Sequence, residues 1–314
     1  MSKRTEFFFP ASAGTHRIHA VQWLPENGVP RAVVQILHGV AEHIGRYEDL
    51  ADYLTGQGFA VVGNDHPGHG QSAAPGDLGF FAAHGGWMHA SNDTRTLQLM
   101  TARQFPGLPY FLLGHSMGSF LARTYLIRFP GTVSGAVLCG TGDMSGALIA
   151  AGRAAASLEA LRLGRQGKSP LLAQLSFGGY NRAFRPNRTE YDWLSANEEN
   201  VDRYIADPLC GFPMTVGLFQ DLMDGLDFIR REPNLRRMDK DTPVLFIAGA
   251  EDPVGDMGKG VRRVYLRFKK AGVRRADIRI YPGMRHEIFN ETEHAQVYAD
   301  LRRWLEAQIG GGAQ

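Results

Sequence analysis

The feature that most restricts the fold is the pattern Gly-x-Ser-x-Gly at Gly114–Gly118. It follows an apolar run, Tyr110–Leu113, and precedes a segment with helical spacing, Ser119–Phe129. A serine on a sharp turn between a strand and a helix presents its hydroxyl outward. Flanking glycines permit the strained backbone and the close approach of helix to strand. The stretch therefore predicts a nucleophile elbow at Ser116, with backbone N–H groups of the helix start beside it.

A nucleophilic serine needs a base and an acid, and two later strand-like runs supply candidates. Val244–Ala248 is followed closely by Asp252, and Ile278–Tyr281 is followed closely by His286. An imidazole takes the serine proton during attack and returns it to the leaving group. A carboxylate fixes the tautomer of that imidazole and stabilises the imidazolium. We therefore predict that Ser116, Asp252 and His286 act together.

Other carboxylates compete with Asp252 for the role of the acid. Glu251 is its immediate neighbour, and we predict that Glu251→Gln is mild whereas Asp252→Asn is severe. Asp143 follows the apolar run Val133–Cys139 and so also lies after a strand end. We favour Asp252 because the strand and turn around it match the requirement better.

The stabilisation of negative charge needs backbone donors near the serine. An apolar run, Val33–Leu37, leads into the segment His38–His43, whose position suits an oxyanion loop. We predict that the backbone N–H groups of Val40 and Met117 form the oxyanion hole.

These motifs resemble the monoacylglycerol lipase/lysophospholipase group of α/β-hydrolases, which is related to the serine aminopeptidases of the same fold. The resemblance covers about Ala32 to Leu305, and its middle part is the least characteristic. It implies the triad Ser116, Asp252 and His286 and the oxyanion donors Val40 and Met117. The motifs that carry it are His38–His43 with Arg46 and Tyr47, Asp65–Ser72, Gly114–Gly118 and Arg285–Glu287.

Strand-like and helix-like segments alternate along most of the chain, which predicts a mostly parallel central sheet with helices on both faces. Early strands without a helix between them predict an antiparallel edge. Further strands are expected at Ile18–Trp23 and Ala60–Asn64, and helices at Tyr47–Gln57, His89–Gln104, Met257–Ala271 and Glu293–Gln308. The alternation stops between Met144 and Met238. We predict an α/β-hydrolase core from 1–143 and 239–314, with a helical cap inserted at 144–238.

The predicted cap combines large apolar side chains with an excess of positive charge. Its apolar residues pack it onto the core, and some are expected to line a cleft for an acyl chain. Residues 150–190 hold seven basic and two acidic residues: Arg153, Arg162, Arg165, Lys168, Arg182, Arg185, Arg188, Glu159 and Glu190. Such a face is usually an ordinary solvated surface, and the alternative is transient contact with an anionic lipid surface. Which residues bind substrate stays open.

Several polar residues suggest a metal site when they are grouped, but no short zinc-type ligand pair is present. We expect them to shape the loops after two adjacent strands, with an ion pair between Glu42 and Arg46; they are His38, Glu42, His43, Asp65, His66 and His69. We predict no metal and no cofactor. Cys139 and Cys210 are expected to be buried thiols.

Length, charge and hydrophobic runs limit the protein class. The 314 residues allow one large α/β domain with an insertion, and a net charge of +2 favours no nucleic-acid partner. The apolar run near the start is too short for a signal peptide, and no run approaches the roughly 18 residues of a membrane span. We expect a cytoplasmic protein.

Together these features predict a serine hydrolase that cleaves carboxylic esters through an acyl-enzyme. The resemblance implies monoacylglycerol- or lysophospholipid-like substrates. The alternatives are an aminopeptidase or amidase of the same fold and a non-catalytic ligand-binding protein.

Overall fold

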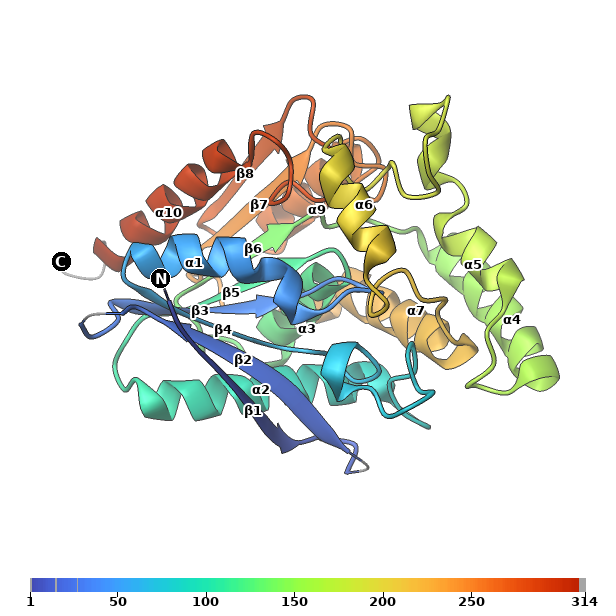
Figure 1. The fold of residues 1–314 in the computed structure, drawn as a ribbon, viewed down its shortest axis with the longest axis horizontal. Coiled ribbons are helices and arrows are strands. Elements are labelled where there is room, and N and C mark those ends of the chain that lie inside the picture. Colours follow the sequence, from blue (N-terminus) through green and yellow to red (C-terminus); the bar gives the residue numbers. More distant parts are fainter. Residues whose placement is uncertain (1, 15, 27, 311–314) are drawn as a thin grey trace.

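An eight-stranded sheet runs through the centre of the computed structural model, which describes residues 2–14, 16–26 and 28–310 (Figure 1). The strand order is β1-β2-β4-β3-β5-β6-β7-β8, and β2 is antiparallel to both of its neighbours. All other neighbouring pairs are parallel. The strands are β1 Lys3–Pro10, β2 Arg17–Leu24, β3 Ala32–Leu37, β4 Phe59–Asn64, β5 Tyr110–His115, β6 Gly135–Cys139, β7 Val244–Gly249 and β8 Ala276–Tyr281.

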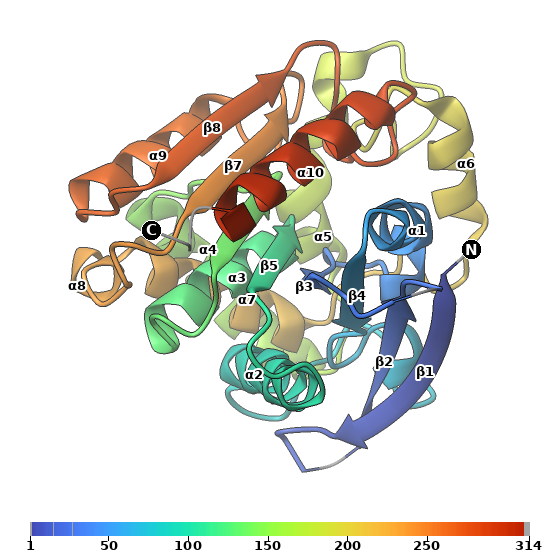
Figure 2. The ribbon, with the colours of Figure 1, turned by 90° about the vertical axis from the view of Figure 1, so that its left-hand side faces the viewer.

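Strands β3 to β7 are buried along their entire length, as expected for parallel strands covered on both faces. One face packs against α1 (Glu48–Gly56) and α10 (His294–Gly310), through side chains such as Leu54 and Leu301. The other face packs against α2 (Gly86–Gln104), α3 (Met117–Arg128) and α9 (Lys259–Lys270). Figure 2 shows these helices on opposite sides of the sheet.

The N-terminal segment was not among the predicted strands, yet it forms β1 at the sheet edge. Most of its side chains are exposed, and Phe9 is buried. Its place comes from pairing with β2, in which Phe7 lies opposite Ala20. The predicted antiparallel edge is therefore present and is wider than the sequence pattern indicated.

Three helix starts differ by two residues or more from the prediction. Helix α3 begins at Met117, two residues earlier than expected. Helix α9 begins at Lys259 instead of Met257, because Asp256 and Met257 have φ values of +51° and +50°, which a helix does not allow. Helix α2 begins at Gly86, three residues earlier than expected.

The segment between β6 and β7 contains helices and no named strand. Helices α4, α5 and α7 begin after Ser145, Ser169 and Thr215, each of which accepts a hydrogen bond from a backbone N–H in the first turn. Figure 1 shows α4 and α5 beyond the end of the sheet. The helices are α4 Gly146–Leu163, α5 Pro170–Phe177, α6 Glu198–Ala206, α7 Val216–Arg230 and α8 Glu232–Leu235, with a 3-10 turn at Tyr180–Phe184.

Helix α7 lies closer to the sheet layer than α4 and α5 do. Its Asp221 Oδ1 accepts a hydrogen bond of 3.1 Å from the Gly86 backbone N–H at the start of α2. Gly225 packs against the Trp87 ring so closely that a Cβ would lie 2.1 Å from it. Thus α7 joins the inserted segment to the core. No described helix is long and apolar enough to span a bilayer.

Candidate active site

Ser116 lies on a strained turn between β5 and α3. Its φ and ψ are +54° and −122°, a rare conformation for a residue with a side chain. A Cβ on Gly114 would lie 2.3 Å from the Gly118 carbonyl oxygen, and one on Gly118 would lie 2.0 Å from the Leu37 carbonyl oxygen. Both glycines are therefore required for the close packing of this turn, as the motif predicted.

His286 and Asp252 form a buried hydrogen-bonded pair. The His286 Nδ1 atom lies 2.9 Å from Asp252 Oδ1, which also accepts the Val254 N–H at 2.9 Å. This bond places the imidazole proton on Nδ1 and leaves Nε2 free to accept a proton. His286 and Ser116 line the same cavity of about 580 Å³.

The competing carboxylates lie elsewhere. Asp143 contacts the guanidinium groups of Arg263 and Arg267, at 3.4 Å and 3.2 Å. Glu251 is exposed. Among the carboxylates considered from sequence, the structure brings only Asp252 to the His286 imidazole.

One predicted oxyanion donor lies in a loop close to Ser116, and the other directly follows Ser116 in the sequence. Val40 lines the cavity, and a Cβ on the preceding Gly39 would lie 3.1 Å from the Ser116 Cβ. Met117 is the first residue of α3. Within the described residues, neither the Val40 nor the Met117 backbone N–H has a hydrogen-bond acceptor. Both are thus available for an oxyanion. We call residues 38–43, the segment predicted to hold the Val40 donor, the oxyanion loop.

A buried charge network supports this loop and the loop of His286. Arg46 Nη1 lies 2.8 Å from Glu42 Oε2 and 2.6 Å from Glu287 Oε1, so the predicted Glu42–Arg46 pair is present. His115 lies 3.3 Å from Glu42 through Nδ1 and 3.2 Å from the His286 carbonyl oxygen through Nε2. Burial acts to raise the pKa of Glu42, but His115 and Arg46 hold it well below its usual value.

Sequence reasoning gave no role to Glu287 or to its partner Asn200, whose Nδ2 donates to Glu287 Oε2 at 2.7 Å. The local signals were the adjacency of Glu287 to His286 and its place in the motif Arg285–Glu287. Asn200 lies on α6, and nothing in the sequence indicates that this helix reaches the site.

The histidines that suggested a metal site form loop contacts. His38 Nε2 accepts the His66 backbone N–H at 3.0 Å, and the two rings lie 4.1 Å apart. Burial, followed by the charge of His38, lowers the pKa of His69 to about 3. Asp65 accepts the Ile44 N–H at 2.9 Å and so joins the two loops.

A different group, His43, Asp207 and Cys210, has donor atoms within 4.8 Å of one another. The Gly45 N–H donates to His43 Nδ1, so the ring proton resides on Nε2, which lies 2.8 Å from Asp207 Oδ2. The arrangement is that of a hydrogen-bonded pair beside a thiol. Cys139 and Cys210 are both free and buried.

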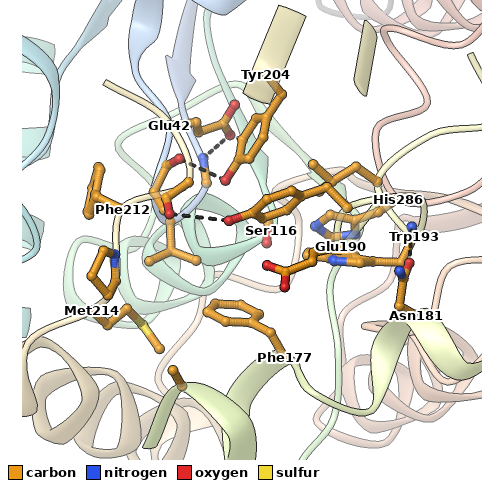
Figure 3. Close-up of a pocket in the computed structure, with 18 of the residues that line it drawn as sticks. Glu42, Ser116, Phe177, Asn181, Glu190, Trp193, Tyr204, Phe212, Met214 and His286 are labelled. Atoms are coloured by element: carbon orange, nitrogen blue, oxygen red, sulfur yellow. Dashed lines mark hydrogen bonds between the residues drawn. The ribbon is translucent and has the colours of Figure 1, made fainter. Parts of the chain in front are cut away.

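The cavity wall has an apolar part and a polar part, with Ser116 and His286 between them (Figure 3). The apolar part includes residues from α5 and from the segment before α7, and the polar part includes the oxyanion loop and α6. The main side chains are Phe177, Trp193, Phe212 and Met214 on the apolar part and Glu42, Tyr204 and Glu287 on the polar part. The polar side chains of Asn181 and Glu190 also line the cavity, near Trp193.

The sheet order, the elbow and the loops at the carboxyl ends of the strands define an α/β-hydrolase. The model of the serine aminopeptidase S33 family matches residues 28–293, and the chain belongs to this family. It is 30% identical to the monoacylglycerol lipase of Mycolicibacterium smegmatis, over 98% of this chain and 99% of the relative. It is also 30% identical to human monoglyceride lipase, over 90% and 84% of the two chains.

Solved structures agree with the predicted fold class. A carboxyl esterase from Bacillus coagulans is 28% identical, with a TM-score of 0.91 over 98% of this chain and all of that chain. A lipase in an open form has a TM-score of 0.86 at 29% identity, with 98% and 99% of the two chains covered. The predicted α/β-hydrolase fold is confirmed.

Proposed function

We propose that the protein hydrolyses carboxylic esters through an acyl-enzyme formed on Ser116. The observation that carries this proposal is the buried His286–Asp252 hydrogen bond of 2.9 Å, in the cavity that also holds the strained Ser116. In this role Ser116 is the nucleophile, His286 the general base and then acid, and Asp252 the orienting carboxylate.

The reaction starts when Ser116 Oγ attacks the ester carbonyl carbon and His286 Nε2 accepts the hydroxyl proton. The Val40 and Met117 N–H groups donate to the oxyanion of the tetrahedral intermediate. His286 then gives the proton to the departing alcohol, which leaves the acyl group on Ser116. Water then attacks this acyl ester while His286 accepts a proton from the water. His286 returns the proton to Ser116 Oγ, and the carboxylic acid is released.

The division of the cavity wall supports a monoacylglycerol-like substrate. An acyl chain fits against Phe177, Phe212 and Met214, and the hydroxyls of a small polar alcohol fit against the polar part of the wall beside Glu42. The Tyr204 hydroxyl already donates to the Ala41 carbonyl oxygen. The relatives named as monoacylglycerol and monoglyceride lipases agree with this substrate class.

The aminopeptidase alternative needs a free anionic group to bind a substrate amino terminus. Glu42 and Glu287 line the cavity, but both lie within contact distance of Arg46, and His115 lies beside Glu42. These two neutralised carboxylates favour an uncharged alcohol over an ammonium group. Glu190 also lines the cavity and is exposed, with no basic partner within the described residues, so it is the carboxylate that an aminopeptidase would use.

We also propose that residues 144–238 act as a cap, with the core formed by 1–143 and 239–314.

We further propose that this cap makes transient contact with lipid surfaces. Several of its leucines are largely exposed, with Leu161 at 87%. Many of its basic side chains already contact carboxylates, such as Arg153 with Asp224 and Arg162 with Glu159. Insertion of the exposed leucines therefore contributes more to lipid binding than the positive charge of the cap does. The exposed leucines of α4 and α5 are Leu148, Leu158, Leu161, Leu171 and Leu175. The cytoplasmic location stays a prediction.

Labelling with a fluorophosphonate tests the proposed chemistry. We expect the wild-type protein to be labelled and Ser116→Ala to be unlabelled while still folded. A series of glyceryl and aryl esters of different chain length, compared with amino-acid amides, then tests the substrate class. A folded wild-type protein that takes no label contradicts the hydrolase, and faster turnover of amides than of esters favours the aminopeptidase.

A further inference from the structure

The chain segment that contains α6 and the loop after it is bonded directly to the oxyanion loop. The Ala41 carbonyl oxygen accepts hydrogen bonds from Tyr204 Oη at 2.9 Å and from the Gly211 N–H at 3.0 Å. His43 Nε2 lies 2.8 Å from Asp207 Oδ2. Three contacts therefore join two segments that are far apart in the sequence.

Ala41 adopts a conformation that needs such support. Its φ is +55°, in the left-handed region that residues with a side chain adopt only at an energetic cost. Ala41 directly follows Val40, the predicted oxyanion donor. A fixed Ala41 carbonyl limits how far the Val40 amide turns away from Ser116.

Tyr204 is held firmly enough to act as this support. Its side chain is buried, and the Arg46 guanidinium lies 4.9 Å from the centre of its ring. Burial, more than the nearby charges, keeps the pKa of Tyr204 well above its usual value, so the hydroxyl remains a donor. Figure 3 shows Tyr204 directed toward the loop that carries Glu42.

We infer that Tyr204 is a positioning residue for the oxyanion hole: its hydroxyl holds the Ala41 carbonyl so that the Val40 N–H stays directed at the reacting oxygen. The inference rests on the proposed function. The helix inserted between β6 and β7 thereby completes a site whose reacting groups all come from the core.

Tyr204→Phe tests this role, with Tyr110→Phe as the matched control. Tyr110 is also a buried tyrosine whose hydroxyl donates a hydrogen bond, to Gln35 Oε1 at 2.7 Å, but it lies at the start of β5 and does not line the cavity. We expect Tyr204→Phe to lower kcat about tenfold with KM unchanged, because a misplaced donor weakens only transition-state binding. Tyr110→Phe should change kcat by less than about twofold.

Two ligands distinguish a misplaced oxyanion donor from a general loss of structure in the variant. A trifluoromethyl ketone forms a tetrahedral adduct with Ser116, whereas a 1-O-alkylglycerol ether binds without reaction. In Tyr204→Phe the ketone affinity should fall by the same factor as kcat, and the ether affinity should stay constant. Both ligands bind only folded protein, so the ratio of their affinities reports positioning even if the variant is less stable.

A substitution at Ala41 provides a rescue experiment. Glycine accepts a positive φ without strain, so Ala41→Gly should reduce the loss caused by Tyr204→Phe. The inference would be overturned if Tyr204→Phe caused the same loss with and without Ala41→Gly, affected KM alone, or lost no more activity than Tyr110→Phe. A wild-type protein that hydrolyses no ester would instead overturn the proposed function.

Discussion

The Nδ1 atom of His286 lies 2.9 Å from Asp252 Oδ1, while Asp252 Oδ2 is buried and has no hydrogen-bond partner within the described residues. Asparagine at position 252 keeps one oxygen but loses the negative charge that stabilises the imidazolium. We expect Asp252→Asn to lower kcat about 10⁴-fold, the loss that the equivalent change causes in a chymotrypsin-type triad. Steady-state kinetics with a soluble aryl ester gives the measurement.

Glu251→Gln is the control for that experiment. Glu251 is exposed and adjacent to Asp252, so its change alters the local charge without touching His286. We expect kcat to change by less than about twofold. Similar losses in the two variants would contradict the assignment of Asp252 as the orienting carboxylate.

Glu42→Gln tests the buried network behind the oxyanion loop. Glu42 Oε2 lies 2.8 Å from Arg46 Nη1, and an amide nitrogen there would face another donor. Loss of one partner of a buried ion pair typically costs about 3–5 kcal/mol. We expect the free energy of unfolding to fall by about 3 kcal/mol in urea titrations. Glu48→Gln, on the exposed start of α1, should leave it nearly unchanged.

The elbow at Ser116 could be predicted because its requirements are local. Two glycines, one strand and one helix lie within a short stretch. Neighbouring backbone atoms pack so closely on both glycines that no side chain fits there. Asp252 and His286 could also be predicted, since parallel strands bring their carboxyl ends to one edge of the sheet. The resemblance to a known family agreed with each of these positions.

The support of the site could not be predicted in the same way. Tyr204 meets Ala41 across 163 positions of the chain, and Asn200 meets Glu287 across 87. Such pairs depend on how a helical insertion folds back over the core, and the apolar spacing of a helix does not specify its direction. Strand β1 escaped prediction for the same reason, because its place depends on pairing with β2.

Leu161→Ser tests the proposed contact of the cap with lipid. Leu161 is 87% exposed on α4, and burial of a leucine side chain contributes about 1.5–3 kcal/mol. We expect its loss to weaken binding to phosphatidylcholine vesicles about tenfold in sedimentation, with little dependence on salt. Turnover of a soluble short-chain ester should not change.

The matched control for the lipid experiment is Leu99→Ser. Leu99 is 40% exposed and lies on α2, which is outside the proposed cap. Vesicle binding should not respond to this change. An equal weakening by both substitutions would show that lipid binding does not depend on the cap.

Asp93 makes the stability of the fold depend on pH. It is fully buried on α2, where Oδ1 accepts the Ser12 N–H at 2.6 Å and Oδ2 has no partner within the described residues. Burial, opposed only by that hydrogen bond, raises its pKa from 3.8 to about 7. The folded state therefore holds a proton that the unfolded state releases, so stability falls as pH rises from about 4 through about 7 and levels off above.

Asp93→Asn removes this titration and should change the pH profile in a defined direction. The wild type loses stability between about pH 5 and about pH 9, and the variant does not. We therefore expect the difference in free energy of unfolding to shift by about 2–3 kcal/mol in favour of the variant over this range. Urea titrations at both pH values give the measurement, with the exposed Asp52→Asn as the control for general charge effects. A stability difference between Asp93→Asn and the wild type that stays constant with pH would show that Asp93 is ionised in the folded protein across this range.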